Sequence, residues 1–194
     1  MSSLLEQDDS VLLVIDAQSG FLPSAGADGT RARDVVARIA WLVGVAAALE
    51  VPIVVTEEQP ERNGPTVRAI ADQLPPATPV LTKPVFGLAD VAEILAAIDA
   101  SGRRTAVLVG AETDVCVAHS ALGLLDRDYR VAVVADATFS PGTMHEHGLR
   151  RIADAGGTVI HAKGVYYEWL RTVDVATAFR QAHPELADPP GFSL

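Results

Sequence analysis

Short, wholly apolar segments alternate with longer amphipathic segments along most of the chain. Residues 11–15 (VLLVI) are continuously apolar, which is typical of a strand buried on both faces of a parallel sheet. Five more apolar runs predict strands at 51–56, 79–82, 105–110, 131–135 and 158–161. Helical periodicity predicts helices at 31–49, 64–73, 88–100, 115–128, 144–155 and 166–181. Strands that alternate with helices predict an α/β fold with three αβα layers, Rossmann-like, around a six-stranded parallel sheet.

The length and the even spacing of these segments predict one domain over residues 1–194. A chain of 194 residues can bury a full core, and it contains no internal repeat and no linker-like stretch. We expect the core to span about residues 10–182, with frayed termini.

Charge and cysteine content narrow the class of partner. The net charge is −10, the opposite of what a phosphate backbone attracts, so we expect no nucleic-acid partner. No apolar run is long enough to span a membrane, and the N-terminal residues lack the basic start of a secretion signal. A single cysteine, Cys116, is typical of a reducing compartment, which predicts a cytoplasmic protein.

Three chemically distinctive residues follow predicted strands. Asp16 comes after the first strand, Lys83 after the third, and Cys116 at the start of the helix after the fourth. Ligands of such sheets bind outside the carboxyl ends of the strands, so the fold can bring the three together. A helix N-terminus favours a thiolate at Cys116, a carboxylate can take or return a proton, and an ammonium group can orient both.

These residues lie in short motifs that resemble the isochorismatase-like cysteine hydrolase superfamily, which includes nicotinamidase, N-carbamoylsarcosine amidohydrolase and isochorismatase. The resemblance covers about residues 10–170, and the segment Gly110-x-Glu112-Thr113 is similar to an uncharacterised branch. The matching segments are Asp16-x-Gln18-x-x-Phe21, Lys83, Gly110-x-x-Thr113-Asp114-x-Cys116-Val117, Gly123-Leu124-Leu125-Asp126 with Tyr129, and Val133-Val134-Ala135-Asp136-Ala137.

The resemblance implies an Asp–Lys–Cys triad and a thioester intermediate. Cys116 would attack a carbonyl, Asp16 would act as general base and then acid, and Lys83 would orient them. It also implies a cis peptide bond between Ala111 and Glu112, and an oxyanion hole formed by the N–H groups of Glu112 and Cys116. The implied reaction is cleavage of a C–N bond in a small amide or carbamoyl compound by a homo-oligomer. Vinyl-ether hydrolysis of the isochorismatase type, small-molecule binding without turnover, and redox sensing remain alternatives.

The loop after the second strand departs from the metal-binding members that the resemblance includes. Nicotinamidases carry an Asp-x-His motif there, whereas residues 56–66 contain no histidine, so we expect no metal and no cofactor. Glu57 and Glu58 point in opposite directions if they extend the strand, so one of them, or Gln59, borders the cleft. We expect Gln18, Phe21, Gln59 and Phe86 to line the substrate pocket. Tyr166 and Trp169 are expected in the core or at a subunit contact.

Overall fold

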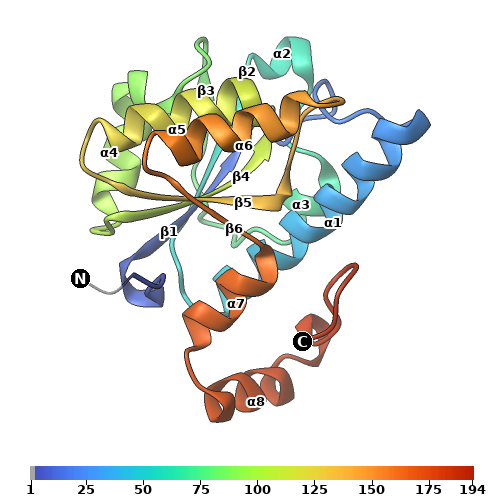
Figure 1. Ribbon diagram of the computed structural model, residues 1–194, viewed down its shortest axis with the longest axis vertical. Coiled ribbons are helices and arrows are strands. Elements are labelled where there is room, and N and C mark those ends of the chain that lie inside the picture. Colours follow the sequence, from blue (N-terminus) through green and yellow to red (C-terminus); the bar gives the residue numbers. More distant parts are fainter. Residues whose placement is uncertain (1–2) are drawn as a thin grey trace.

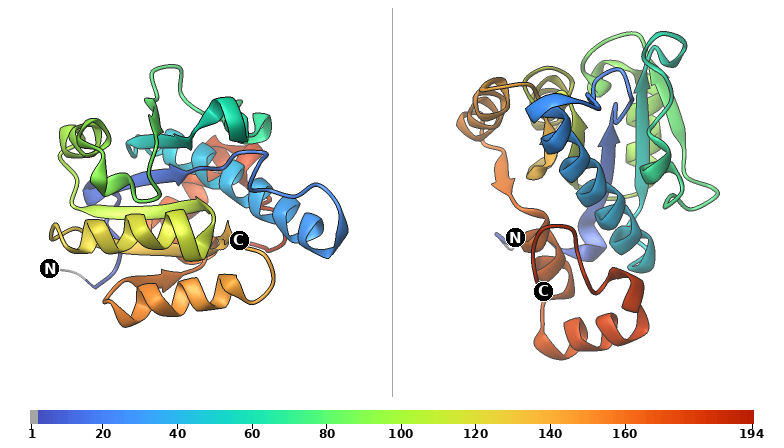
Figure 2. Two further views of the ribbon diagram at one scale, coloured as in Figure 1. Left: turned by 90° about the horizontal axis from the view of Figure 1, so that it is seen from above. Right: turned by 90° about the vertical axis from the view of Figure 1, so that its right-hand side faces the viewer.

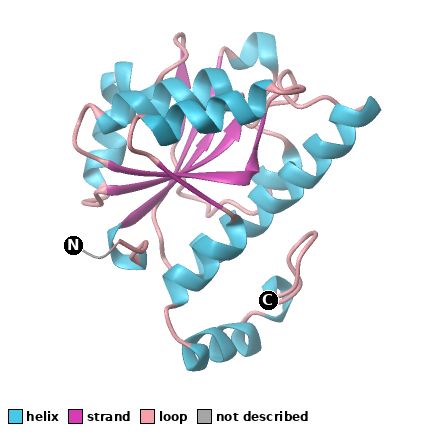
Figure 3. Cartoon of the chain, in the orientation of Figure 1, coloured by secondary structure: helices cyan, strands magenta, loops and turns pink. Residues whose placement is uncertain are grey.

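The computed structural model of the chain describes residues 3–194, and a twisted sheet of six parallel strands forms its centre (Figure 1; Figure 3). The strand order is β3-β2-β1-β4-β5-β6, so consecutive strands run outward from β1 in one direction and from β4 in the other. The strands are β1 (Ser10–Ile15), β2 (Ile53–Glu58), β3 (Val80–Lys83), β4 (Thr105–Ala111), β5 (Arg130–Phe139) and β6 (Thr158–Ile160). This arrangement confirms the predicted fold class.

Helices cover both faces of the sheet (Figure 2). One face carries α1 (Gly26–Ala48), α3 (Arg68–Ala71), α7 (Ala162–Leu170) and α8 (Val173–Ala182). The other carries α4 (Ala92–Ala100), α5 (Ala118–Leu125) and α6 (Met144–Asp154). The short helix α2 (Pro60–Asn63) follows β2. None of the helices within residues 3–194 is long and apolar enough to cross a membrane.

The alternation of side chains along β1 divides the core in two. Leu12 and Val14 pack under α1 and α7, whereas Leu13 and Ile15 pack under α4 and α5. Every residue of β1 is buried, because a central parallel strand is covered on both sides. This is the reason that its sequence is continuously apolar rather than alternating.

Two of the predicted helices differ in the structure. The segment predicted as one helix at 64–73 is helical only in the single turn α3, and α2 ends before that segment begins. The segment predicted at 166–181 forms α7 and α8, separated at Arg171, whose φ of 67° lies in the left-handed region. Thr172 then caps α8 by accepting a hydrogen bond from the N–H of Val175. A residue in the left-handed backbone conformation ends an α-helix. The periodicity of apolar side chains alone does not show where such a residue lies.

The C-terminal segment beyond α8 packs onto the domain. The Trp41 Nε1–H donates to the carbonyl of Leu186 at 2.9 Å, and the Phe192 ring packs edge-on against Trp41. Part of the expected N-terminal fraying concerns residues 1–2, which lie outside the described residues. Tyr166 and Trp169 lie in the core, as one of the two alternatives predicted.

Candidate active site

The strand order reverses between β1 and β4, and polar side chains gather at the carboxyl ends of the strands around this point. Asp16 follows β1 directly, with φ of 46°, and its N–H donates to the carbonyl of Thr56 on β2 at 3.0 Å. Lys83 is the last residue of β3 and reaches across β2. Its Nζ lies 2.5 Å from Asp16 Oδ2, and both side chains are fully buried.

Hydrogen bonds compensate both charges of this buried pair. Thr56 Oγ1 donates to Asp16 Oδ1 at 2.8 Å, and Lys83 Nζ donates to the carbonyls of Val85 and Phe86 at 3.0 and 2.9 Å. Burial raises the pKa of Asp16, and the Lys83 ammonium opposes that rise. A buried ion pair with its remaining donors and acceptors satisfied is tolerated, whereas either charge alone would be costly.

Cys116 lies in η3 (Thr113–Val117), a π-helical turn between β4 and α5, and its side chain is 2% exposed. Its Sγ–H donates to Glu58 Oε2 at 3.3 Å. One ligand atom each of Asp16, Glu58 and Cys116 lies within 4.8 Å of the other two. The thiol is therefore placed between two carboxylates, one of them paired with Lys83.

This environment reverses the expected ionisation of the cysteine. Burial raises the pKa of the Cys116 thiol, the charge of Asp16 raises it further, and the hydrogen bonds to Asp16 and Glu58 act in the same direction. Lys83 opposes these effects without overcoming them. The sequence alone favoured a thiolate because of the helix N-terminus. The structure favours the protonated thiol, because the thiol is buried and the carboxylates of Asp16 and Glu58 lie beside it.

Glu58 is the last residue of β2, which runs two residues farther than predicted. It pairs in register with Lys83 of β3, and it lies on the same face of the sheet as Thr56 because side chains alternate along a strand. Glu57 points to the opposite face, where its carboxylate accepts hydrogen bonds from the N–H and hydroxyl of Thr66 at 2.7 and 2.8 Å. Of the two candidate acids, Glu58 is the one that reaches the cysteine.

The side chain of Gln18 holds the Glu58 backbone in place. Its Nε2 donates to the carbonyls of Glu58 and Gly64 at 3.0 and 2.5 Å, and its Oε1 accepts from the N–H of Glu58 at 2.8 Å. Gln18 is fully buried. Its bonds to three backbone groups fix the β2 loop, and its expected contact with a substrate stays a prediction.

The turn before the cysteine brings the backbone close to β1. The peptide bond between Ala111 and Glu112 is cis, at the position that the resemblance implied. Gly110 has φ of +127°, and a Cβ there would lie 1.8 Å from the carbonyl oxygen of Ile15, so a side chain does not fit. The carbonyl of Glu112 accepts from the N–H of Val117 at 3.0 Å, which closes the π-helical turn.

Elements on the far side of the turn anchor it. Ser140, just after β5, donates from its hydroxyl to Asp114 Oδ1 at 2.6 Å. His145 of α6 lies with Nδ1 2.9 Å from Thr113 Oγ1, and burial lowers the pKa of its imidazole. Neither residue was expected from the sequence, because both contacts depend on how β5 and α6 pack.

The other expected pocket residues lie around this centre with different exposure. Phe86 is 51% exposed and packs edge-on against His119. Phe21 is half-buried against the core under α1. Gln59 is half-buried with φ of 40° and begins α2. Phe86, on the loop whose carbonyls bind Lys83, is the most exposed of them and is free to contact a ligand.

Asp16, Glu58 and Cys116 are close enough to form three metal ligands, but their surroundings do not suit a cation. The Lys83 ammonium lies 2.5 Å from Asp16 Oδ2 and takes the place that a metal ion would need on that carboxylate. The other Asp16 oxygen accepts from Thr56. The chemistry of this donor set is that of an acid–base pair beside a thiol.

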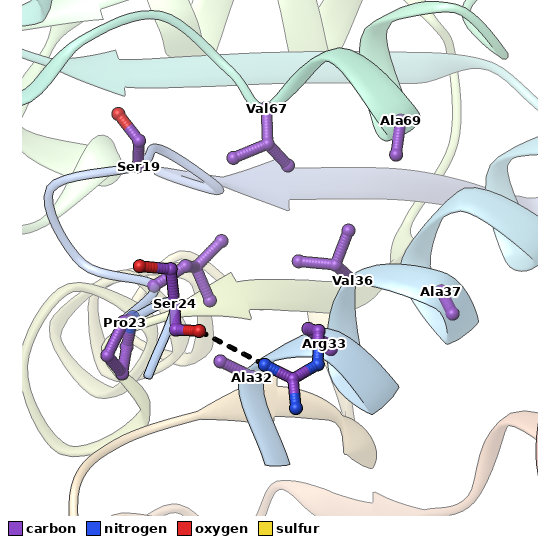
Figure 4. Close-up of a pocket in the computed structure, with 10 residues that line it drawn as sticks. Ser19, Pro23, Ser24, Ala32, Arg33, Val36, Ala37, Val67 and Ala69 are labelled. Carbon is purple, nitrogen blue, oxygen red and sulfur yellow. Dashed lines mark hydrogen bonds between the residues drawn. The ribbon is translucent and has the colours of Figure 1, made fainter. Parts of the chain in front are cut away.

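A separate cavity of about 430 Å³ lies between α1, α3 and the loop that follows Gln18 (Figure 4). Its walls are mainly apolar, and Arg33 bridges one end by donating to the carbonyl of Ser24 at 3.1 Å. Asp16, Lys83 and Cys116 do not line it. The volume of a cavity therefore does not identify the reactive centre in this fold.

Comparisons with known proteins agree with the fold. The Isochorismatase domain model matches residues 10–164. Isochorismatase domain-containing protein 2 of Xenopus laevis is 34% identical over 179 residues, which cover 88% of this chain and 82% of that protein. The probable hydrolase YcaC of Escherichia coli (strain K12) is 27% identical over 195 residues, covering 93% and 89%.

Solved structures of other proteins have the same fold. The crystal structure of the E. coli YcaC gene product, described as an octameric hydrolase of unknown specificity, aligns with a TM-score of 0.81 at 23% identity over 96% of this chain and 94% of that one. YcaC from Pseudomonas aeruginosa, solved with hexane-2,5-diol and covalent acrylamide, aligns with a TM-score of 0.79 at 25% identity over 96% and 95%. The chain belongs to the isochorismatase domain family, a family of isochorismatase-like hydrolases.

Proposed function

We propose that the protein is a cysteine hydrolase that cleaves a C–N bond in a small amide or carbamoyl compound through a thioester. The observation that carries the proposal is the position of the Cys116 thiol, whose Sγ lies within 4.8 Å of an Asp16 carboxylate oxygen while Asp16 is paired with Lys83. A nucleophile, a base within reach and a third group that orients the base are what covalent catalysis requires.

In the first step, Cys116 Sγ attacks the carbonyl carbon as its proton passes to the Asp16 carboxylate. Burial and the Asp16 charge raise the pKa of the thiol, so we propose that transfer of its proton accompanies attack. Burial raises the pKa of Asp16, which makes this carboxylate a stronger proton acceptor than one in water. Lys83 holds it in position and balances its charge.

In the second step, the C–N bond breaks and Asp16 returns the proton to the leaving nitrogen, which leaves a thioester on Cys116. Water then attacks the thioester, releases the acid and restores the thiol. The N–H groups of Glu112 and Cys116 are the proposed donors to the oxyanion, and each such donor is worth about 3–4 kcal/mol in the transition state.

Two relatives support parts of this proposal. The P. aeruginosa YcaC structure contains covalent acrylamide, a compound that thiols attack readily. The octameric assembly of E. coli YcaC supports a homo-oligomer for this chain. We propose a metal-independent and cofactor-independent enzyme of the cytoplasm, since residues 56–66 contain no histidine, Lys83 pairs with the Asp16 carboxylate, and the chain has a single cysteine.

The test is to trap the acyl-enzyme by intact-mass analysis after mixing the protein with a panel of small amides and carbamoyl compounds. We expect an acyl mass increment on wild-type protein, located at Cys116 by peptide mapping, and none on Cys116→Ser. Turnover of the same compound should fall by at least about 10⁴-fold in Cys116→Ser, which keeps its fold because the side chains are similar in size.

Three results would decide against the proposal. Hydrolysis of a vinyl ether such as isochorismate that persists in Cys116→Ser would favour ether cleavage. Ready, reversible oxidation of Cys116 with no adduct from any compound would favour a redox sensor. Tight binding of a compound with no chemistry would favour a binding protein.

A further inference from the structure

We infer that Glu58 selects the substrate by charge, so that the cysteine site takes a small amide carrying a positive group and rejects anionic ones. The inference rests on the proposed function and adds to it the class of substrate. It starts from the contact between Glu58 Oε2 and Cys116 Sγ, 3.3 Å apart, because a group that touches the nucleophile also lies beside the carbonyl that the nucleophile attacks.

The position of Glu58 is fixed by the fold. Its backbone N–H and carbonyl both bond to the Gln18 amide, and its carbonyl also accepts from Asn63 Nδ2 at 2.9 Å. It pairs in register with Lys83 on β3. A carboxylate on so rigid a backbone keeps one place relative to the thiol, which a specificity group must do.

The negative charge of Glu58 is not compensated by the protein. Lys83 is the cation nearest the cysteine site, and it is fully used by Asp16 and two backbone carbonyls. Among residues 3–194, no lysine, arginine or histidine forms an ion pair with Glu58 or Glu112. Glu58 is half-buried, so part of its side chain stays accessible to a ligand at the thiol.

Neighbouring acids add to the same field. Burial raises the pKa of the Glu112 carboxyl, and the charges of Asp114 and Glu58 raise it further, which places all three acids near one another. The charges of the buried pair Asp16 and Lys83 cancel. A ligand that approaches Cys116 therefore meets net negative charge from the neighbouring acids. A positive group gains from that field, and a carboxylate substrate is repelled in a partly desolvated site.

The experiment uses three acrylamides that share one reactive group and differ in charge. These are N-(2-aminoethyl)acrylamide as the cation, N-(2-hydroxyethyl)acrylamide as the neutral compound, and N-acryloyl-β-alanine as the anion. Each adds to the thiol in the same way: the Sγ–Cβ bond forms and the thiol proton passes to the α-carbon. Second-order rates of adduct formation on Cys116, divided by the rate for the neutral compound, cancel any change in the reactivity of the thiol itself.

We compare the wild-type protein with Glu58→Gln, and with Glu61→Gln as a control. Glu61 is an exposed acid on α2 whose loss changes the net charge equally. We expect the wild-type cation-to-anion rate ratio to be at least about tenfold, to fall to near unity in Glu58→Gln, and to stay at the wild-type value in Glu61→Gln. A ratio that Glu58→Gln leaves unchanged, or that Glu61→Gln lowers equally, overturns the inference.

The outcomes separate this inference from the proposed function. If the ratio depends on Glu58 but no amide or carbamoyl compound is hydrolysed, charge selection stands and the hydrolase proposal falls. If an amide is hydrolysed while cation and anion react at equal rates, the hydrolase proposal stands and charge selection falls. Failure of all three compounds to form an adduct on Cys116 overturns both.

Discussion

The two carboxylates on either side of Cys116 have the same chemistry and opposite surroundings. Asp16 is fully buried, and its oxygens contact Lys83 and Thr56. Glu58 is only half-buried, its carboxylate accepts from the thiol, and it has no cationic partner within residues 3–194. The difference shows that one group can belong to the core of the fold while its neighbour remains available to an incoming molecule.

The largest expected effect comes from Asp16→Asn, which leaves the Lys83 ammonium buried without a counter-charge. Removing one member of a buried pair lowers the free energy of unfolding by about 3–5 kcal/mol, and loss of the base should lower turnover at least about 100-fold. Urea unfolding and steady-state kinetics measure the two effects. The double variant Asp16→Asn with Lys83→Met should regain stability but not activity. A stability within about 1 kcal/mol of the wild type would show that the pair is not needed by the fold.

The next effect comes from Gln18→Ala, which removes the amide that holds the β2 loop. Buried backbone groups at Glu58 and Gly64 lose their partners, so the free energy of unfolding should fall by about 1–3 kcal/mol. The cation-to-anion preference should also weaken, because the Glu58 carboxylate is no longer fixed. Gln181→Ala, at an exposed residue of α8 far along the chain from the site, is the matched control and should change neither quantity. Equal losses in both variants would contradict the role of the Gln18 amide.

The raised thiol pKa makes stability depend on pH. In the unfolded chain the thiol titrates near its ordinary pKa of 9.0, whereas the folded thiol keeps its proton above that pH. The folded state then holds more protons, so rising pH favours unfolding. Relative to Cys116→Ser, the wild-type protein should lose about 1.4 kcal/mol between pH 8 and pH 10. Parallel stability curves for the two proteins would show that the thiol pKa is not raised.

The smallest expected effect on stability comes from Glu58→Gln. The carboxylate is only half-buried and forms no ion pair, so the free energy of unfolding should change by less than about 0.5 kcal/mol. The pKa of Cys116 should fall, because the hydrogen bond to Glu58 raises it, and alkylation by neutral iodoacetamide should become faster. Chemical unfolding and alkylation rates measured from pH 7 to 10 test both. A stability loss as large as that of Asp16→Asn would remove the contrast between the two acids.

The sequence predicted the layers and the strand ends because these depend on local properties. Continuous apolar runs mark strands that helices cover on both faces, as in β1. The position of Asp16 just after such a run followed directly from the pattern. The end of β2 did not follow from the pattern. Glu57 and Glu58 are charged, yet both belong to the strand. The sequence left Glu57, Glu58 and Gln59 as three candidates for the border of the cleft. Side chains alternate along a strand, so a strand extended from Thr56 would have selected Glu58.

The sequence by itself determined the fold class, the family motifs and the three residues that follow strands. It could not determine the order of the strands around the centre or the environment of the thiol. The tertiary structure decided that Lys83 crosses from β3 to Asp16, that Glu58 contacts Cys116, and that the cysteine is therefore a protonated thiol. The physical reason is that a pKa depends on burial and on charges a few ångströms away, and those charges come from strands far apart in the chain.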